Sequence, residues 1–171
     1  MFSDSGRNMR RKAKKTIGNN ALRMLLVLFV VIAAGICSRF FYQLMLIQGD
    51  SMKPAYHNMQ LVILNKADRH FQPGDVIAFQ CEGLNSVLVK RIIAGEGDTV
   101  YIRHGTLYVN NLPSDVYPPE TFSYAGILAE TVQLEKDDYL VIGDNIPESR
   151  DSRYPEVGIV KTGTIIGKVC R

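Results

Sequence analysis

The chain has 171 residues, three cysteines and a formal net charge of +3. This length leaves room for one folded domain, and the cysteine count argues against a disulfide-stapled secreted scaffold, which carries an even set of four or more cysteines. The charge is unevenly spread, because residues 1–23 hold seven basic residues against Asp4 and the remainder carries −3. A basic tail can bind nucleic acid, but basic residues that abut a hydrophobic segment mark its cytoplasmic end. We therefore predict a lipid bilayer, and no nucleic acid, as a partner.

A membrane helix is the first predicted element. Residues 24–37 carry no charge, but as a helix they would span only ~21 Å, which is less than the ~30 Å hydrocarbon core. Residues 22–42 would span ~31 Å, provided that Arg23 and Arg39 extend toward opposite interfaces. An aromatic belt then forms the outer end and consists of Phe40, Phe41 and Tyr42.

This helix predicts the organisation of the chain. We expect a basic cytoplasmic tail over residues 1–21, a single-pass anchor in the cytoplasmic membrane over residues 22–42, and an extracytoplasmic domain over residues 43–171. A cleaved signal peptide is the alternative, with a small-x-small site at residues 35–37. The long basic region and the aromatic residues directly past that site favour the retained anchor.

The rest of the chain shows β-strand patterns separated by turn residues. Residues 103–105 (Arg-His-Gly) predict a hairpin turn, and residues 111–131, with three prolines, predict the longest irregular connection. We expect residues 44–47 to form the first core strand, to provide an apolar surface next to the bilayer, or to do both. The predicted fold class is mainly β, a compact β-sheet or barrel-like domain that closes on itself or folds as two sheets, behind one N-terminal transmembrane helix. The expected strands cover residues 60–65, 76–79, 87–94, 99–102, 106–109, 139–142 and 164–169.

Candidate chemistry starts at Ser51, in the Gly-Asp-Ser-Met-Lys-Pro segment at residues 49–54. A nucleophilic serine needs a base to take its proton, and a lysine kept neutral in apolar surroundings can serve. The two histidines between Ser51 and Lys90 are His57 and His70, and neither has the sequence context of a triad base. Ser51 and Lys90 are therefore the candidate nucleophile and base.

Lys90 can act as a base only if its pKa is lowered. An exposed lysine has a pKa near ~10.4, and lowering it to about 8 costs on the order of 3 kcal/mol, which burial can impose. With the two-residue period of a strand, Lys90 shares an apolar face with Leu88 and Ile92, while Arg91 points the other way. The alternative is an ordinary surface lysine, but the combination with the Ser51 segment favours the base.

A third polar cluster follows a predicted strand and covers residues 143–153. On its own it fits a solvated loop with local Asx turns. Its alternative is part of a site, in which Ser149 or Ser152 hydrogen-bonds a lysine amine and Asp151 forms an ion pair with Arg153.

Together these segments resemble a bacterial type I signal peptidase, the membrane-bound Ser/Lys protease that releases exported proteins from their signal peptides. The resemblance extends in order from the anchor to Lys168. Four matching segments behind one anchor make it specific. They are residues 51–54 (Ser-Met-Lys-Pro), 74–79 (Gly-Asp-Val-Ile-Ala-Phe), 90–98 (Lys-Arg-Ile-Ile-Ala-Gly-Glu-Gly-Asp) and 143–153 (from Gly-Asp-Asn to Asp-Ser-Arg).

The resemblance implies a role for each matching side chain. Ser51 would be the nucleophile, with its backbone N–H as an oxyanion donor, and Lys90 the general base and later the acid to the leaving amine. Ser149 would help to hold the Lys90 amine, while Asp151 and Arg153 would support the site structurally. The implied activity is the removal of signal peptides from exported preproteins at small-x-small (Ala-x-Ala) sites.

The resemblance also implies how the partner preprotein binds. An extended segment would lie beside the strands near the dyad, with backbone hydrogen bonds for affinity and small side chains at −1 and −3 for specificity. The candidate substrate-binding residues are Met52, Pro54 and Leu88. No cofactor is expected. No metal is expected either, because the three histidines have no metal-ligand spacing with one another or with the cysteines.

Some positions depart from the family pattern. Ala55-Tyr56 stands where the family usually has Thr-Leu, and Ile146 stands where it usually has Arg. Gly49 lacks the hydroxyl that some members use as a second oxyanion donor, and losing such a donor can cost ~10²–10³ in rate. Cys81 and Cys170 are the possible extracytoplasmic pair, although two unpaired small residues are the favoured reading.

Three other functions fit parts of the sequence. An autoprotease resembling the SOS-response repressors would share the Gly-Asp-Ser-Met motif, but this chain has an anchor where those proteins carry a cytoplasmic regulatory region. A non-catalytic assembly factor that binds exported subunits usually lacks the nucleophile or the base, and both Ser51 and Lys90 are present. A membrane-anchored structural β protein leaves the four matching segments unexplained.

Overall fold

The computed structural model describes residues 22–36 and 39–170. The chain divides into two compact units, Met1–Phe41 and Tyr42–Arg171. The predicted cytoplasmic tail over residues 1–21 lies outside the described residues.

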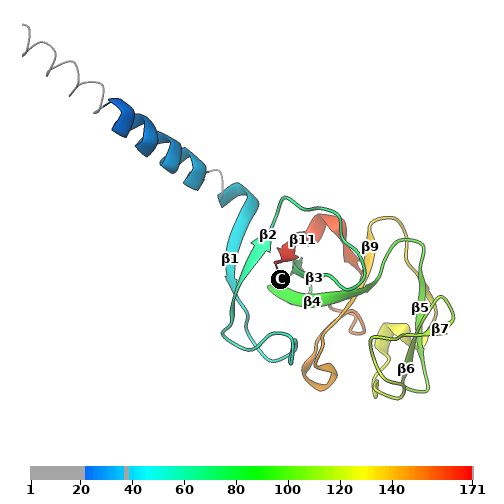
Figure 1. The fold of residues 1–171 in the computed structure, drawn as a ribbon. Coiled ribbons are helices and arrows are strands. Elements are labelled where there is room, and N and C mark those ends of the chain that lie inside the picture. Colours follow the sequence, from blue (N-terminus) through cyan, green and yellow to red (C-terminus); the bar gives the residue numbers. More distant parts are fainter. Residues whose placement is uncertain (1–21, 37–38, 171) are drawn as a thin grey trace, which may run out of the picture. The chain divides into compact units, whose positions relative to one another are not determined.

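The described part of the first unit is helical. The helix Leu22–Phe41 has 20 residues and is long and apolar enough to cross a membrane, judged by length and composition (Figure 1). The large apolar side chains among its described residues are exposed. Tyr42, which we expected to end the anchor, instead begins the first strand. Cys37, in the alternative cleavage site, lies outside the described residues.

The second unit is built from antiparallel strands, so the predicted mainly β class is confirmed. A seven-stranded sheet has the order β1-β2-β11-β3-β4-β9-β10, and a four-stranded sheet has the order β7-β6-β5-β8 (Figure 1). Of the two arrangements that we predicted, the structure has the two-sheet one. The strands are β1 (Tyr42–Leu46), β2 (Leu61–Asn65), β3 (Val76–Cys81), β4 (Ser86–Ala94), β5 (Thr99–Arg103), β6 (Thr106–Val109), β7 (Leu112–Pro113), β8 (Val132–Gln133), β9 (Asp138–Ile142), β10 (Val160–Lys161) and β11 (Ile165–Val169). The 3₁₀ turns are η1 (Gly126–Ala129), η2 (Ile146–Glu148) and η3 (Thr162–Thr164).

The predicted hairpin turn joins β5 to β6. Arg103 pairs with Thr106, which leaves a two-residue loop of His104 and Gly105. Both loop residues have positive φ angles, 49° and 73°, as the tight turns that match strand twist require. The glycine bears this conformation without a side-chain penalty, so the sequence signal for this turn is confirmed.

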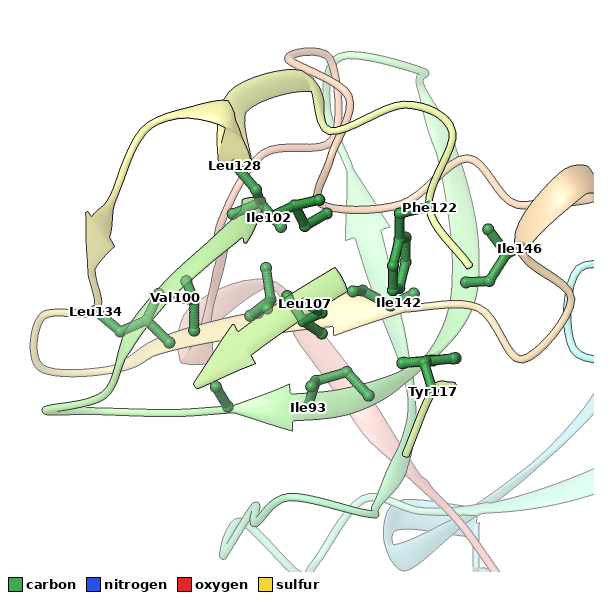
Figure 2. Packing of buried hydrophobic residues seen from close by; sticks show 12 residues of the cluster. Ile93, Val100, Ile102, Leu107, Tyr117, Phe122, Leu128, Leu134, Ile142 and Ile146 are labelled. Carbon is green, nitrogen blue, oxygen red and sulfur yellow. The ribbon is translucent and has the colours of Figure 1, made fainter. Parts of the chain in front are cut away.

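A hydrophobic cluster packs the second sheet against β4 and β9. Figure 2 shows Ile93 of β4 and Ile142 of β9 in one cluster with Val100 of the second sheet, and all three are buried. The irregular connection that we predicted after β6 is also anchored here, because Tyr117 and Phe122 belong to the same cluster and their rings meet edge to face at 5.2 Å. Ile146, which follows β9, is in this cluster as well. The core therefore fixes both the turn after β9 and the irregular connection after β6.

Strand β4 is covered on both faces in its second half. Val89 packs in a cluster with Met52 and Val76, and Ile92 packs in another with Ile77. Lys90 lies between these two positions and is only 3% exposed. A long cationic side chain is thus held where water hardly reaches it.

Candidate active site

The turn that carries Ser51 follows β1 and is anchored by its neighbour. Met52 is 1% exposed and packs in the core with Ile47 and Leu64. The turn is closed by backbone hydrogen bonds, including Tyr56 N–H to the Met52 carbonyl at 2.9 Å. Because its neighbour is fixed in the core, the backbone at Ser51 is held in place, and the Ser51 residue is half-buried.

Ser51 and Lys90 meet across the molecule. The Lys90 Nζ and Ser51 Oγ atoms are 2.7 Å apart, a short hydrogen-bond distance between residues 39 positions apart in sequence. Burial lowers the pKa of Lys90 to about 8; the carboxylates of Asp151 and Asp144 act in the opposite direction, and Arg153 adds to the lowering. A lysine with this pKa has a sizeable neutral fraction near neutral pH, and a neutral amine can accept the proton of the serine hydroxyl.

Three further candidates from the sequence form one buried network. Asp151 receives a 2.6 Å hydrogen bond from the Ser149 hydroxyl and a 2.8 Å ion-pair hydrogen bond from Arg153 Nε. The Arg153 guanidinium also donates to the backbone carbonyl of Ser149 at 3.2 Å. The Ser149 proton is therefore directed to Asp151 rather than to Lys90. Ser152 was the other candidate to hold the lysine amine. Its hydroxyl instead accepts a hydrogen bond from the Val141 N–H at 3.0 Å.

Gly143 is the point at which this network touches the turn that carries Ser51. Its N–H donates to Asp151 Oδ2 at 3.2 Å. A Cβ at this position would lie 2.6 Å from the Ser51 carbonyl oxygen and 2.3 Å from the Ser149 hydroxyl. Only a residue without a side chain allows this approach, which is a physical reason for glycine here that the sequence did not reveal.

Asn145 is a contact residue that the sequence analysis did not single out. Its backbone N–H donates to the Ser51 carbonyl at 2.9 Å, and its side-chain Nδ2 donates to the Asp50 carbonyl at 3.1 Å. The residues after β9 thus hold the two peptide groups that flank Ser51. The available signal was a short polar triplet, Gly-Asp-Asn, directly after a strand.

Arg91 and Tyr117 brace the same region from the other face of β4. Arg91 makes a two-point ion pair with Asp144, at 2.8 Å and 2.6 Å, and donates to the Gly74 carbonyl at 2.9 Å. Tyr117 donates its hydroxyl proton to the Gly143 carbonyl at 3.2 Å. Burial raises the pKa of Tyr117, so the hydroxyl stays protonated and remains a donor.

Replacing Arg91 by alanine is expected to lower the free energy of unfolding by about 2–3 kcal/mol, because Asp144 would keep a mostly buried charge without its partner. The matched control is Arg150→Ala, whose ion pair with Glu156 is more exposed and should cost less than about 1 kcal/mol. Urea unfolding of the detergent-solubilised protein measures both. Equal losses for the two variants would contradict a special contribution of the Arg91 pair.

The predicted substrate-binding residues lie in two different places. Met52 and Leu88 line a groove of about 380 Å³ between β1 and β4, together with Ser51 and Lys90. Pro54 does not line this groove. It contributes to a second one of about 640 Å³, which is also lined by Arg91, Tyr117, Asp144 and Ile146.

The remaining candidate residues are the cysteines and the possible metal ligands. Cys81 is buried and Cys170 is exposed, and both are free thiols. Within residues 22–36 and 39–170, no group of three or more metal-ligating side chains comes together. In this part of the chain, the candidate residues that combine close contact with a buried amine are Ser51 and Lys90.

Comparison with known proteins places the chain in a family. A family model described as signal peptidase, peptidase S26, matches residues 21–170. Signal peptidase I P of Bacillus subtilis subsp. natto is 28% identical over 153 residues, 82% of each chain, and signal peptidase I of Bacillus licheniformis is 30% identical over 138 residues, 74% of each chain. Among solved structures, the signal peptidase I of Enterococcus faecalis V583 is 29% identical, with a TM-score of 0.47 over 59% of this chain and 97% of that one. The chain therefore belongs to the signal peptidase family, peptidase S26, as a type I signal peptidase and hence a serine peptidase.

Proposed function

We propose that the protein is a membrane-anchored endopeptidase that removes signal peptides from exported preproteins at Ala-x-Ala sites, with Ser51 as nucleophile and Lys90 as general base. The observation that carries this proposal is the 2.7 Å separation of Ser51 Oγ from a lysine amine that is 3% exposed. A serine hydroxyl is weakly nucleophilic until a neighbouring base takes its proton, and a buried neutral amine is such a base.

The dyad accounts for every proton in the reaction. The neutral Lys90 amine takes the Ser51 proton as Oγ bonds to the carbonyl carbon of the residue before the scissile bond. The Ser51 N–H donates to the resulting oxyanion. Lys90 then gives the proton to the departing amine of the mature protein as the C–N bond breaks. Water, deprotonated by the same amine, then attacks the acyl carbon. Lys90 returns that proton to Ser51 Oγ as the ester bond breaks, which frees the signal peptide and restores the neutral amine.

The buried network of Ser149, Asp151 and Arg153 supports the dyad structurally. Asp151 and Arg153 form a paired unit with exposed fractions of 0% and 2%, so neither charge is left unbalanced in the interior. The Ser149 hydroxyl donates its proton in a hydrogen bond to Asp151. We infer that Ser149 holds the Lys90 amine through an oxygen lone pair, as the acceptor of an amine proton.

The groove beside the dyad suits an extended peptide. In the described part of the chain, β1 pairs with β2 alone, and residues 86–90 of β4 pair with β3 alone. Both strands therefore have an unpaired edge, and the groove between them contains Ser51 and Lys90. A preprotein segment added there would gain backbone hydrogen bonds, and alternate side chains, at −1 and −3, would face the groove wall with Met52 and Leu88.

The membrane places substrate and site together. The 20-residue apolar helix supports a single-pass anchor, with the basic tail in the cytoplasm and the β unit outside. Ser51 follows Phe41 by ten residues, which reach at most ~36 Å when fully extended. Leu44 and Leu61 are exposed on the first two strands and suit contact with the headgroup region. A preprotein whose signal peptide is still inserted in the membrane presents its cleavage site close to the membrane surface.

Cleavage of a labelled preprotein with an Ala-x-Ala site, in detergent or lipid, tests the proposal. The expected product ends at the second alanine by mass spectrometry. Replacing the −1 alanine by phenylalanine should lower kcat/KM by at least about 100-fold, since a large side chain loses binding in a small pocket and is overpacked there. The matched control places phenylalanine at −2, which points away from the groove. Binding without cleavage would instead favour the assembly-factor function.

A further inference from the structure

We propose that Asn145 is a positioning residue that orients and polarises the peptide group between Asp50 and Ser51, and so sets the strength of the oxyanion donor. This inference rests on the proposed function, because it concerns the Ser51 N–H of that reaction. It assigns a task to a side chain that touches neither the reacting hydroxyl nor the lysine amine.

The geometry links the Asn145 side chain to that peptide group. Its Nδ2 donates to the Asp50 carbonyl at 3.1 Å, where the Lys53 N–H is a second donor at 3.2 Å. The Asp50 carbonyl and the Ser51 N–H belong to the same planar amide. Fixing the direction of the carbonyl therefore fixes the opposite direction of the N–H. The second bond, from the Asn145 N–H to the Ser51 carbonyl at 2.9 Å, stops the next peptide group from rotating.

A hydrogen bond to the carbonyl also changes the electrostatics of the amide. Hydrogen bonds in a chain strengthen one another by ~10–30% per bond, so a donor at the Asp50 oxygen makes the Ser51 N–H more positive. Gly49 has no side chain to offer a second donor, and its N–H is directed to Asn58 Oδ1 at 2.9 Å. The oxyanion thus depends strongly on the one N–H that Asn145 acts upon.

Asn145 is itself held firmly. Asp144, its neighbour, is fixed by the two-point ion pair with Arg91, and Gly143 is fixed by the Tyr117 hydroxyl. The Asn145 carbonyl accepts a bond from Glu148 N–H at 3.1 Å, which starts the following 3₁₀ turn. A donor placed on such a braced segment needs no reorganisation when charge develops on the substrate.

The chain offers a matched control. Asn58→Ala removes one side-chain hydrogen bond to the same turn, at Gly49, but leaves the Asp50–Ser51 peptide group untouched. Asn145→Ala removes the Nδ2 bond and keeps the backbone N–H bond to Ser51. Asn145→Asp keeps the side-chain volume but replaces the donor by an acceptor, so it separates the hydrogen bond from packing.

The experiment compares transition-state and ground-state interactions. Kinetics with an Ala-x-Ala peptide are measured at the alkaline plateau, together with inhibition by a peptide aldehyde, which forms a tetrahedral adduct with the serine. We expect both Asn145 variants to lose about 10-fold in kcat, with KM within 2-fold, since removing a direct donor costs ~10²–10³ and this effect is indirect. The aldehyde inhibition constant should rise by the same factor, while Asn58→Ala stays near wild type.

Two further readouts separate this role from a merely structural one. In a Ser51→Ala background, Asn145→Ala should leave the Kd of the uncleaved peptide unchanged. The midpoint of the pH profile of Asn145→Ala should also stay at the wild-type value. The inference is overturned if kcat matches that of Asn58→Ala, or if peptide binding falls as much as kcat. If wild type and Ser51→Ala cleave equally, the proposed function itself fails.

Discussion

Replacing Ser51 by alanine, or Lys90 by methionine, is expected to lower kcat/KM for a preprotein by at least about 10⁴-fold, because nucleophile and base act as a unit and neither works alone. Both should leave peptide binding nearly unchanged, because the two strand edges and the Met52 and Leu88 side chains remain in the groove when either reacting side chain is replaced. Cleavage assays combined with peptide-binding titrations measure the two quantities. A variant at Lys90 that retained a tenth of the wild-type rate would contradict its role as base.

The same Lys90 variant should be more stable than the wild type. The pKa of Lys90 is lowered from 10.5 to about 8, which corresponds to about 3 kcal/mol of unfavourable free energy when the amine is protonated in the folded state. Methionine has a similar length and no charge, and it loses the hydrogen bond to Ser51, worth about 1 kcal/mol. At pH 7 we therefore expect a gain of about 2 kcal/mol in the free energy of unfolding.

The sign of this effect follows from proton binding. Between pH 8 and 10.5 the unfolded chain holds the Lys90 proton and the folded protein does not, so the stability of the wild type rises with pH in this window. The advantage of Lys90→Met should accordingly shrink as pH rises through it. Ser51→Ala serves as the control, because it keeps the buried amine. A Lys90→Met protein less stable than the wild type at pH 7 would show that the amine is not destabilising.

The local pattern of the sequence predicted most of the longer strands, and the structure brings the two candidate residues Ser51 and Lys90 within 2.7 Å of each other. The hairpin at residues 103–105 needs only local turn chemistry, and β4 is long enough for its period to place Lys90 among apolar residues. Short pairings were missed, such as the two-residue strands β7, β8 and β10, because two residues carry no periodic signal. Their pairing depends on neighbours that are distant in sequence.

The rest of the site could not be predicted because it depends on contacts between distant segments. Asn145 reaches a turn 95 positions earlier, and Arg91 pairs with Asp144 over 53 positions. The resemblance implied a Ser149 contact to the lysine, but it did not show that the Ser149 proton is directed to Asp151. Pro54, in the same turn as Ser51, contributes to a different groove because the chain reverses direction there.

The pH dependence of cleavage is the second large expected effect. Because burial lowers the pKa of Lys90 to about 8, kcat/KM should rise with pH and reach a plateau above that value. The base is active only as the neutral amine, so the rate should fall about tenfold for each pH unit below the midpoint, to about 1% of the plateau at pH 6. Since kcat/KM reports the free enzyme, the measured midpoint belongs to the unliganded site.

Neighbouring charges should move this midpoint in a predictable direction. The Asp144 carboxylate raises the pKa of Lys90, so Asp144→Asn should shift the profile to lower pH, whereas Lys136→Met, at an exposed lysine, should leave it in place. Peptide cleavage between pH 5 and 10, with folding checked at each pH, measures the three profiles. A midpoint near 10.5 would describe a lysine in water, and one near ~6.5 would indicate a histidine base. A flat profile from pH 5 to 9 would remove Lys90 from the mechanism, since no amine with a lowered pKa could then control the rate.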